Sequence, residues 1–206
     1  VDESAIVIGE PRSPQAEHTL ILGWNPMAPL LLRELENYVA AGSEVRVVGS
    51  YSDGIEAARA ARPPTEKLRI RLFEGDPTDR ATLDRLEIPV FDHVVLISEN
   101  PDDDERTDAR TLVTLLHLRD IREQSGSRFS IVSEMQDVRN RALAEITRAD
   151  DFIIGDQLVS LLLTQVSENK RLNAVFSDLF DPEGAELYLK PAGDYVRLDR
   201  EVRFAT

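Results

Sequence analysis

Residues 19–24 (TLILGW) form a continuous apolar run that ends at Gly23 and Trp24. A run of this kind, without alternating polar positions, is typical of a strand buried on both faces of a parallel sheet. Residues 27–41 follow with leucines at helical spacing, and Gly42 supplies the stop. A buried strand that passes directly into a helix predicts the first half of a β–α–β unit.

The alternation of strand and helix continues as far as residue 154. Further strands are predicted at residues 44–49, 67–73, 91–98, 128–133 and 151–154. Helices are predicted at residues 54–61, shortly after residue 79, at 103–123 and at 138–146. The residues of the longest helix that we expect to face the core are Ala109, Leu112, Val113 and Leu116. Because parallel strands are joined by right-handed crossovers, this order predicts an α/β, Rossmann-like doubly wound sheet over residues 17–154.

The pattern changes after residue 154. Residues 156–168 are apolar on most faces of the predicted helix, and a second short helix is predicted at residues 172–181. Two interpretations remain open: a pair of core helices, or a pair that projects and packs against a second subunit. Alternation at residues 185–190 and 195–204 predicts strands of a small second lobe. We therefore divide the chain into an N-terminal linker (1–16), a Rossmann-like domain (17–154), crossover helices (155–181) and the start of a C-terminal lobe (182–206).

The composition excludes several functional classes. The 206 residues carry 24 Lys and Arg against 38 Asp and Glu, a formal net charge of −14, which would repel nucleic acid and anionic membranes. No cysteine is present, so disulfides, thiolate metal sites and cysteine nucleophiles are excluded. No apolar stretch approaches the roughly 20 residues that span a bilayer. Because the chain begins at Val1, we expect a piece of a longer protein.

The loop after the first strand resembles a degenerate dinucleotide fingerprint. It keeps Gly23 but has Asn25 where the second glycine belongs, and a side chain there weakens a phosphate cradle. Ser50 follows the second strand, where an acidic residue would hold ribose hydroxyls. We take Gly23, Asn25, Ser50 and Asp76 as candidate cofactor-binding residues, with a relic loop or another ligand favoured over ordinary NAD binding. The sequence has no nucleophile elbow, Walker loop or paired-histidine motif, so no catalytic residue is predicted.

Six acidic residues lie within ten positions at the start of the longest helix: Glu99, Asp102, Asp103, Asp104, Glu105 and Asp108. Two interpretations remain open here as well. Carboxylates are favoured in the first turn of a helix by its dipole and its free N–H groups. Several oxygen ligands near one point are also what a hard cation such as Ca²⁺ requires.

Five motifs in this order resemble the RCK (TrkA-N-type) regulatory domains of potassium channels and transporters, and among them the CASTOR/POLLUX ion channels and their bacterial relatives. The motifs are HTLILGW (18–24), TDAR (107–110), IVSEMQD (131–137), LLLTQVSENKRLNAVFSDLF (161–180) and GAELYLK (184–190).

The resemblance implies a gating function. It implies an N-terminal membrane pore in the full-length chain, a cytoplasmic domain attached to it, dimers formed through helices 156–181, and a ring of four subunits or a multiple of four. It also implies calcium, with Glu99, Asp102, Asp104 and Asp108 as candidate ligands, and makes nucleotide regulation doubtful. The alternatives are a nucleotide-dependent oxidoreductase and a soluble scaffold that keeps a relic Rossmann fold.

Overall fold

The computed structural model describes residues 6, 15–51, 53–99, 104–181, 192–197, 199 and 201, with only the backbone of Asp104 and Asp194. Six parallel strands form one sheet in the order β3-β2-β1-β4-β5-β6. Their bounds are β1 (His18–Leu22), β2 (Ser43–Gly49), β3 (Leu68–Glu74), β4 (His93–Leu96), β5 (Ser130–Met135) and β6 (Asp151–Ile154). The strand order reverses between β1 and β4, so the predicted Rossmann-like doubly wound fold is confirmed.

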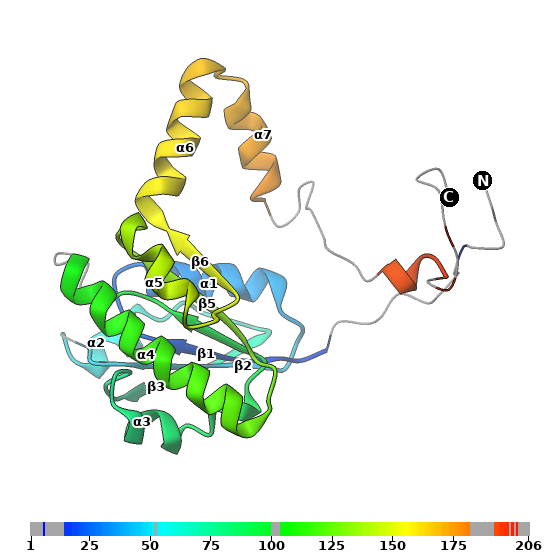
Figure 1. Cartoon of the computed structure of the whole chain (residues 1–206). Helices are drawn as coiled ribbons and strands as arrows, with labels where there is room; N and C mark the ends of the chain where they lie inside the picture. The colour runs from blue at the N-terminus through cyan, green and yellow to red at the C-terminus, as the bar shows by residue number, and fades with distance from the viewer. Residues whose placement is uncertain are drawn as a thin grey trace. The chain divides into compact units, whose positions relative to one another are not determined.

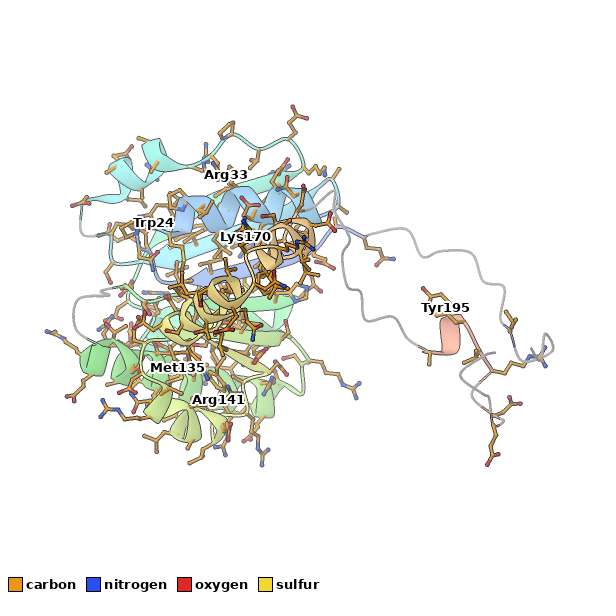
Figure 2. The ribbon with its side chains drawn as sticks, turned by 90° about the horizontal axis from the view of Figure 1, so that it is seen from above. Trp24, Arg33, Met135, Arg141, Lys170 and Tyr195 are labelled. Carbon is orange, nitrogen blue, oxygen red and sulfur yellow. The ribbon has the colours of Figure 1, made fainter. Side chains whose placement is uncertain are left out.

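Helices cover the sheet on both faces (Figure 1). Their bounds are α1 (Ala28–Tyr38), α2 (Ile55–Ala61), α3 (Arg80–Arg85), α4 (Asp104–Ser125) and α5 (Arg141–Glu145), with short 3₁₀ turns η2 (Ile88–Val90) and η3 (Val138–Asn140). Adjacent residues of β1 show the two layers: Ile21 packs in the core beneath α1 and α2, whereas Leu20 packs in the core beneath α4. In Figure 2 Trp24 lies among the blue and cyan elements of the first layer and Met135 among the green elements of the second.

The buried face of α4 differs from the predicted one. Ala109, Val113 and Leu116 are exposed, so the predicted inward face was wrong at these three positions, whereas Leu112 is half-buried and packs against the core. The residues that α4 buries are Thr107, Asp108, Thr111, Thr114, Leu115, Leu118 and Ile121. Apolar periodicity selected the wrong face because the N-terminal half of this helix buries threonines and an aspartate beside the end of the sheet, where polar partners are available.

Contacts divide the chain into two compact units, residues 15–169 and residues 1–14 together with 170–206. Helix α6 (Gly155–Glu168) belongs with the sheet and leads away from β6 (Figure 1), so the first unit extends beyond residue 154. The second unit contains α7 (Leu172–Leu179), the 3₁₀ turn η4 (Ala192–Asp194) and an antiparallel bridge between Ile6 and Val196. The strand predicted at 185–190 lies outside the described residues. Within the described ranges, none of the helices combines the length and the apolar character of a membrane-spanning segment.

Candidate functional site

A cavity of about 360 Å³ opens at the carboxyl ends of the strands. Its floor is apolar and comes from the ends of β1 and β4, and its walls come from the loops after β2 and β3 and from α4. The residues that line it are Leu22, Gly23, Ser50, Asp76, Pro77, Thr78, Leu96, Ile97, Glu99, Arg106, Thr107, Arg110, Thr111 and Thr114. The structure therefore brings together Gly23, Ser50 and Asp76, three of the four residues predicted to bind a cofactor.

Arg110 connects the two carboxylates of this cavity. Its Nη2 atom donates to Oδ1 of Asp76 at 2.8 Å and to Oε2 of Glu99 at 3.1 Å. Oε1 of Glu99 accepts the backbone N–H of Ser50 at 2.9 Å. Burial alone would raise the pKa of Asp76, but hydrogen bonds from Thr78 and the charge of Arg110 outweigh it and hold this pKa below its usual range. The loops after β2, β3 and β4 and helix α4 thus share one network of charges.

The glycine of the loop after β1 is required by the packing of the sheet. Gly23 has φ +107°, and a Cβ atom there would lie 2.1 Å from the carbonyl oxygen of Ile97. The first glycine of the degenerate fingerprint therefore has a structural reason that does not involve a phosphate.

Asn25, the fourth residue predicted to bind a cofactor, is 7% exposed and holds its own loop. Its Nδ2 donates to the carbonyl oxygen of Ser98 at 2.8 Å, and its Oδ1 accepts the backbone N–H of Met27 at 2.9 Å. Pro26, next in the chain, has no N–H. Both polar atoms of the Asn25 side chain are thus bonded within the protein. The residues present at this loop therefore do not fit the diphosphate of a dinucleotide.

Asp108 is 1% exposed and serves the fold directly. Its carboxylate accepts the backbone N–H groups of Gln136 (2.8 Å) and Asp137 (3.0 Å) and the Nδ2 of Asn140 (2.8 Å). It therefore fastens α4 to the loop between β5 and η3.

The predicted calcium site is only partly described. Glu99 lies at the cavity and Asp108 at the β5–η3 loop, each with the partners given above, whereas Asp102 and the side chain of Asp104 lie outside the described residues. Among the side chains that the structure describes, no three His, Asp or Glu residues are grouped so that they could hold a metal ion. Calcium binding at this cluster stays a prediction.

Sequence reasoning missed the contribution of α4 to the cavity. Arg106 and Arg110 are one helical turn apart, as are Thr107 and Thr111, and both pairs line it. This spacing, on a helix that starts at the switch point of the sheet, was the signal available in the sequence.

No family model matches the chain. It is 27% identical to the ion channel POLLUX of Lotus japonicus over 233 residues, covering 94% of this chain and 25% of that protein. It is 25% identical to the probable ion channel CASTOR of Oryza sativa subsp. japonica over 234 residues, covering 94% of this chain and 25% of that protein. The chain thus spans about a quarter of the length of these relatives.

Two solved structures share the fold. The NAD(P)-binding domain of an exopolyphosphatase-related protein from Archaeoglobus fulgidus superposes with a TM-score of 0.54 at 16% identity, covering 74% of this chain and 98% of that one. The TrkA-N domain of an Escherichia coli inner membrane protein superposes with a TM-score of 0.52 at 12% identity, covering 74% of this chain and 97% of that one. Taken with the sequence similarity over most of the chain, the fold confirms the resemblance that the motifs indicated: the chain is homologous to a segment of the CASTOR and POLLUX ion channels.

Proposed function

We propose that this chain is the regulatory domain of a cation channel, on the cytoplasmic face of the membrane, and that ligand or cation binding at the carboxyl edge of its sheet biases the opening of a pore. The observation that carries the proposal is the similarity to ion channels over more than nine-tenths of the chain. The cavity supports a binding role over a catalytic one. Its described lining contains no histidine, cysteine or lysine, and both of its carboxylates pair with Arg110.

Self-association through α6 and α7 is part of the proposal. Neither helix buries a residue in this chain, so the interpretation as core helices is not supported. The exposed apolar side chains are Leu158, Val159, Leu161 and Leu163 on α6, Val175 on α7, and Phe180 directly after α7. Each Å² of apolar surface withdrawn from water contributes about 25 cal/mol. Contact with a second copy that covers these side chains would therefore be favourable. Dimers formed in this way would assemble further into a ring of four subunits or a multiple of four.

Light scattering on the purified chain tests the assembly. Leu163 is 66% exposed, so Leu163→Glu should leave the fold intact and place a charge in the contact between copies. We expect a dimer or larger species for the wild type and a monomer for this variant. Val90→Glu is the matched control, because Val90 is 55% exposed on η2 and belongs to neither of the two helices. A wild-type chain that stays monomeric would refute the assembly.

Calcium is the cation we propose for the acidic segment, with Glu99, Asp102, Asp104 and Asp108 as ligands. It is supported by six acidic residues within ten positions. Calorimetric titration with Ca²⁺ tests it on the wild type and on a double variant, Asp102→Asn with Asp104→Asn. Binding that is lost in the double variant supports the site, and a wild type without heat of binding removes it.

A further inference from the structure

Two side chains cross the switch point of the sheet. Asn25, after β1, reaches the carbonyl oxygen of Ser98, after β4. Glu99, also after β4, reaches the N–H of Ser50, after β2, and β1 lies between these two strands. The crevice through which a dinucleotide diphosphate runs in this fold is therefore bridged by the chain itself.

The first turn of α1 offers few donors to a diphosphate. The N–H of Met27 donates to Oδ1 of Asn25, and the N–H of Ala28 donates to the backbone carbonyl oxygen of Asn25 at 3.0 Å. Pro29 has no N–H, and the N–H of Leu31 is bonded to the carbonyl oxygen of Met27 at 3.0 Å. Helix N-termini bind phosphate through several free N–H groups, and most of those in this turn are already used.

The charges of the neighbouring cavity also disfavour a diphosphate. The lining contains two arginines, Arg106 and Arg110, and two carboxylates, Asp76 and Glu99, so its formal charges cancel. A diphosphate would have to approach both carboxylates while most of its usual donors are occupied. A ligand without net charge meets no such repulsion.

The Glu99 carboxylate lies at the end of β2, where the sequence has no acidic residue of its own. In dinucleotide-binding folds an acidic residue at the end of the second strand accepts the ribose hydroxyls, and here Ser50 occupies that position. The bond to the Ser50 N–H brings the Glu99 carboxylate to the same strand end, and a Cβ atom at Gly49 would lie 3.2 Å from its Oε1. Of the roughly four acceptor positions of a carboxylate, Ser50 and Arg110 leave at least one for a ligand hydroxyl.

We propose that this cavity binds a nucleoside-class ligand, an aromatic base with vicinal hydroxyls and no diphosphate, and that Glu99 accepts its hydroxyls. The proposal rests on the proposed regulatory function and names the ligand class of that same cavity. The apolar floor of Leu22, Leu96 and Ile97 suits the face of a base, and the hydroxyl of Thr111 on α4 suits its polar edge. A volume of about 360 Å³ accommodates a ligand of this size.

Calorimetry on the full chain tests the proposal with four ribonucleosides (adenosine, guanosine, cytidine and uridine), the 2′-deoxy form of the one that binds best, and ADP and NAD⁺. We expect at least one ribonucleoside to bind, and its 2′-deoxy form to bind about tenfold more weakly because one hydrogen bond is lost. ADP and NAD⁺ should bind more weakly than that nucleoside. Glu99→Gln should weaken the nucleoside about tenfold, whereas Glu105→Gln, an exposed acid of α4 outside the cavity, should not.

Three results would overturn the proposal: no ribonucleoside binds, ADP or NAD⁺ binds as tightly as the nucleoside, or the 2′-deoxy form binds equally well. The last comparison uses only the wild type, so it holds even if Glu99→Gln does not fold. Light scattering on the same sample separates this proposal from the proposed function. An oligomer that ignores nucleosides refutes the ligand class alone, and a monomer that binds them refutes the assembly alone.

Discussion

Asp108→Asn should destabilise the fold without touching the cavity. The wild-type carboxylate is almost fully buried and accepts three hydrogen bonds, two of them from backbone N–H groups of the β5–η3 loop. The asparagine amide keeps one acceptor oxygen, but its NH₂ group then faces at least one of the groups that donate to the carboxylate in the wild type, and no hydrogen bond forms there. Hydrogen bonds to a charged group contribute about 1.5–3 kcal/mol each, so losing one and weakening the others should cost about 3 kcal/mol.

Thermal unfolding by circular dichroism measures this loss. For a chain of this size about 1 kcal/mol corresponds to roughly 2–4 °C, so the midpoint of Asp108→Asn should fall by about 6–12 °C. Glu105→Gln is the control, because Glu105 is an exposed acid in the same part of α4. Both variants are measured in EDTA, which removes any contribution of bound cations. A midpoint of Asp108→Asn equal to that of the control would refute the structural role of these three hydrogen bonds.

Two other substitutions test the edge of the sheet. Gly23→Ala should cost at least about 2 kcal/mol, because its Cβ atom would collide with the carbonyl oxygen of Ile97. Gly126→Ala, also at positive φ but with open space around it, should cost only about 1 kcal/mol. Urea titration of both variants measures the two losses. Asp76→Asn tests the lowered pKa of Asp76. The hydrogen bonds of this carboxylate and its ion pair with Arg110 stabilise the fold at pH values above the pKa of Asp76 in the unfolded chain. This stabilisation is lost as the pH falls through the lower pKa of Asp76 in the folded chain. The variant should therefore be less stable than the wild type at neutral pH and approach it in acid; a difference that grows in acid would contradict this reasoning.

The strands could be predicted because their sequence signal is local. A strand that is covered on both faces must be apolar at consecutive positions, and Leu20, Ile21 and Leu22 satisfy that requirement with no exposed surface beyond 1%. Alternation places β3, whose Leu68, Ile70 and Leu72 alone face a core. The doubly wound arrangement then follows from the right-handed crossovers, whereas the order of the strands comes from the structure.

The inner face of α4 could not be predicted from apolar spacing. Its C-terminal half buries Leu115 and Leu118, but its N-terminal half buries Thr107 and Thr111 toward the cavity and Asp108 toward the β5–η3 loop. Averaged over its whole length, such a helix has no single apolar side. The polar residues that define its orientation are the ones that a hydrophobic pattern treats as solvent-facing.

The cross-links of the candidate site were beyond the sequence for a different reason. Asn25 and Ser98 are 73 positions apart, and Ser50 and Glu99 are 49 apart, so no local spacing relates them. The sequence predicted that each residue would lie at the carboxyl edge. Which of them pair depends on how far each side chain reaches along this edge, and only the folded sheet determines that.

These cross-links also bear on how a ligand could act. A ligand shifts a conformational equilibrium only by the difference in its affinity for the two states. Glu99 and Arg110 belong both to the cavity and to the network that joins β2, the loop after β3 and α4. A ligand hydroxyl bonded to the free acceptor position of Glu99 therefore joins the network that links these elements, and its affinity depends on how they are arranged. A difference of about 1.4 kcal/mol per site is a tenfold bias. In the proposed assembly the coupled subunits would multiply this bias, so a modest difference in affinity would be sufficient for the proposed regulation.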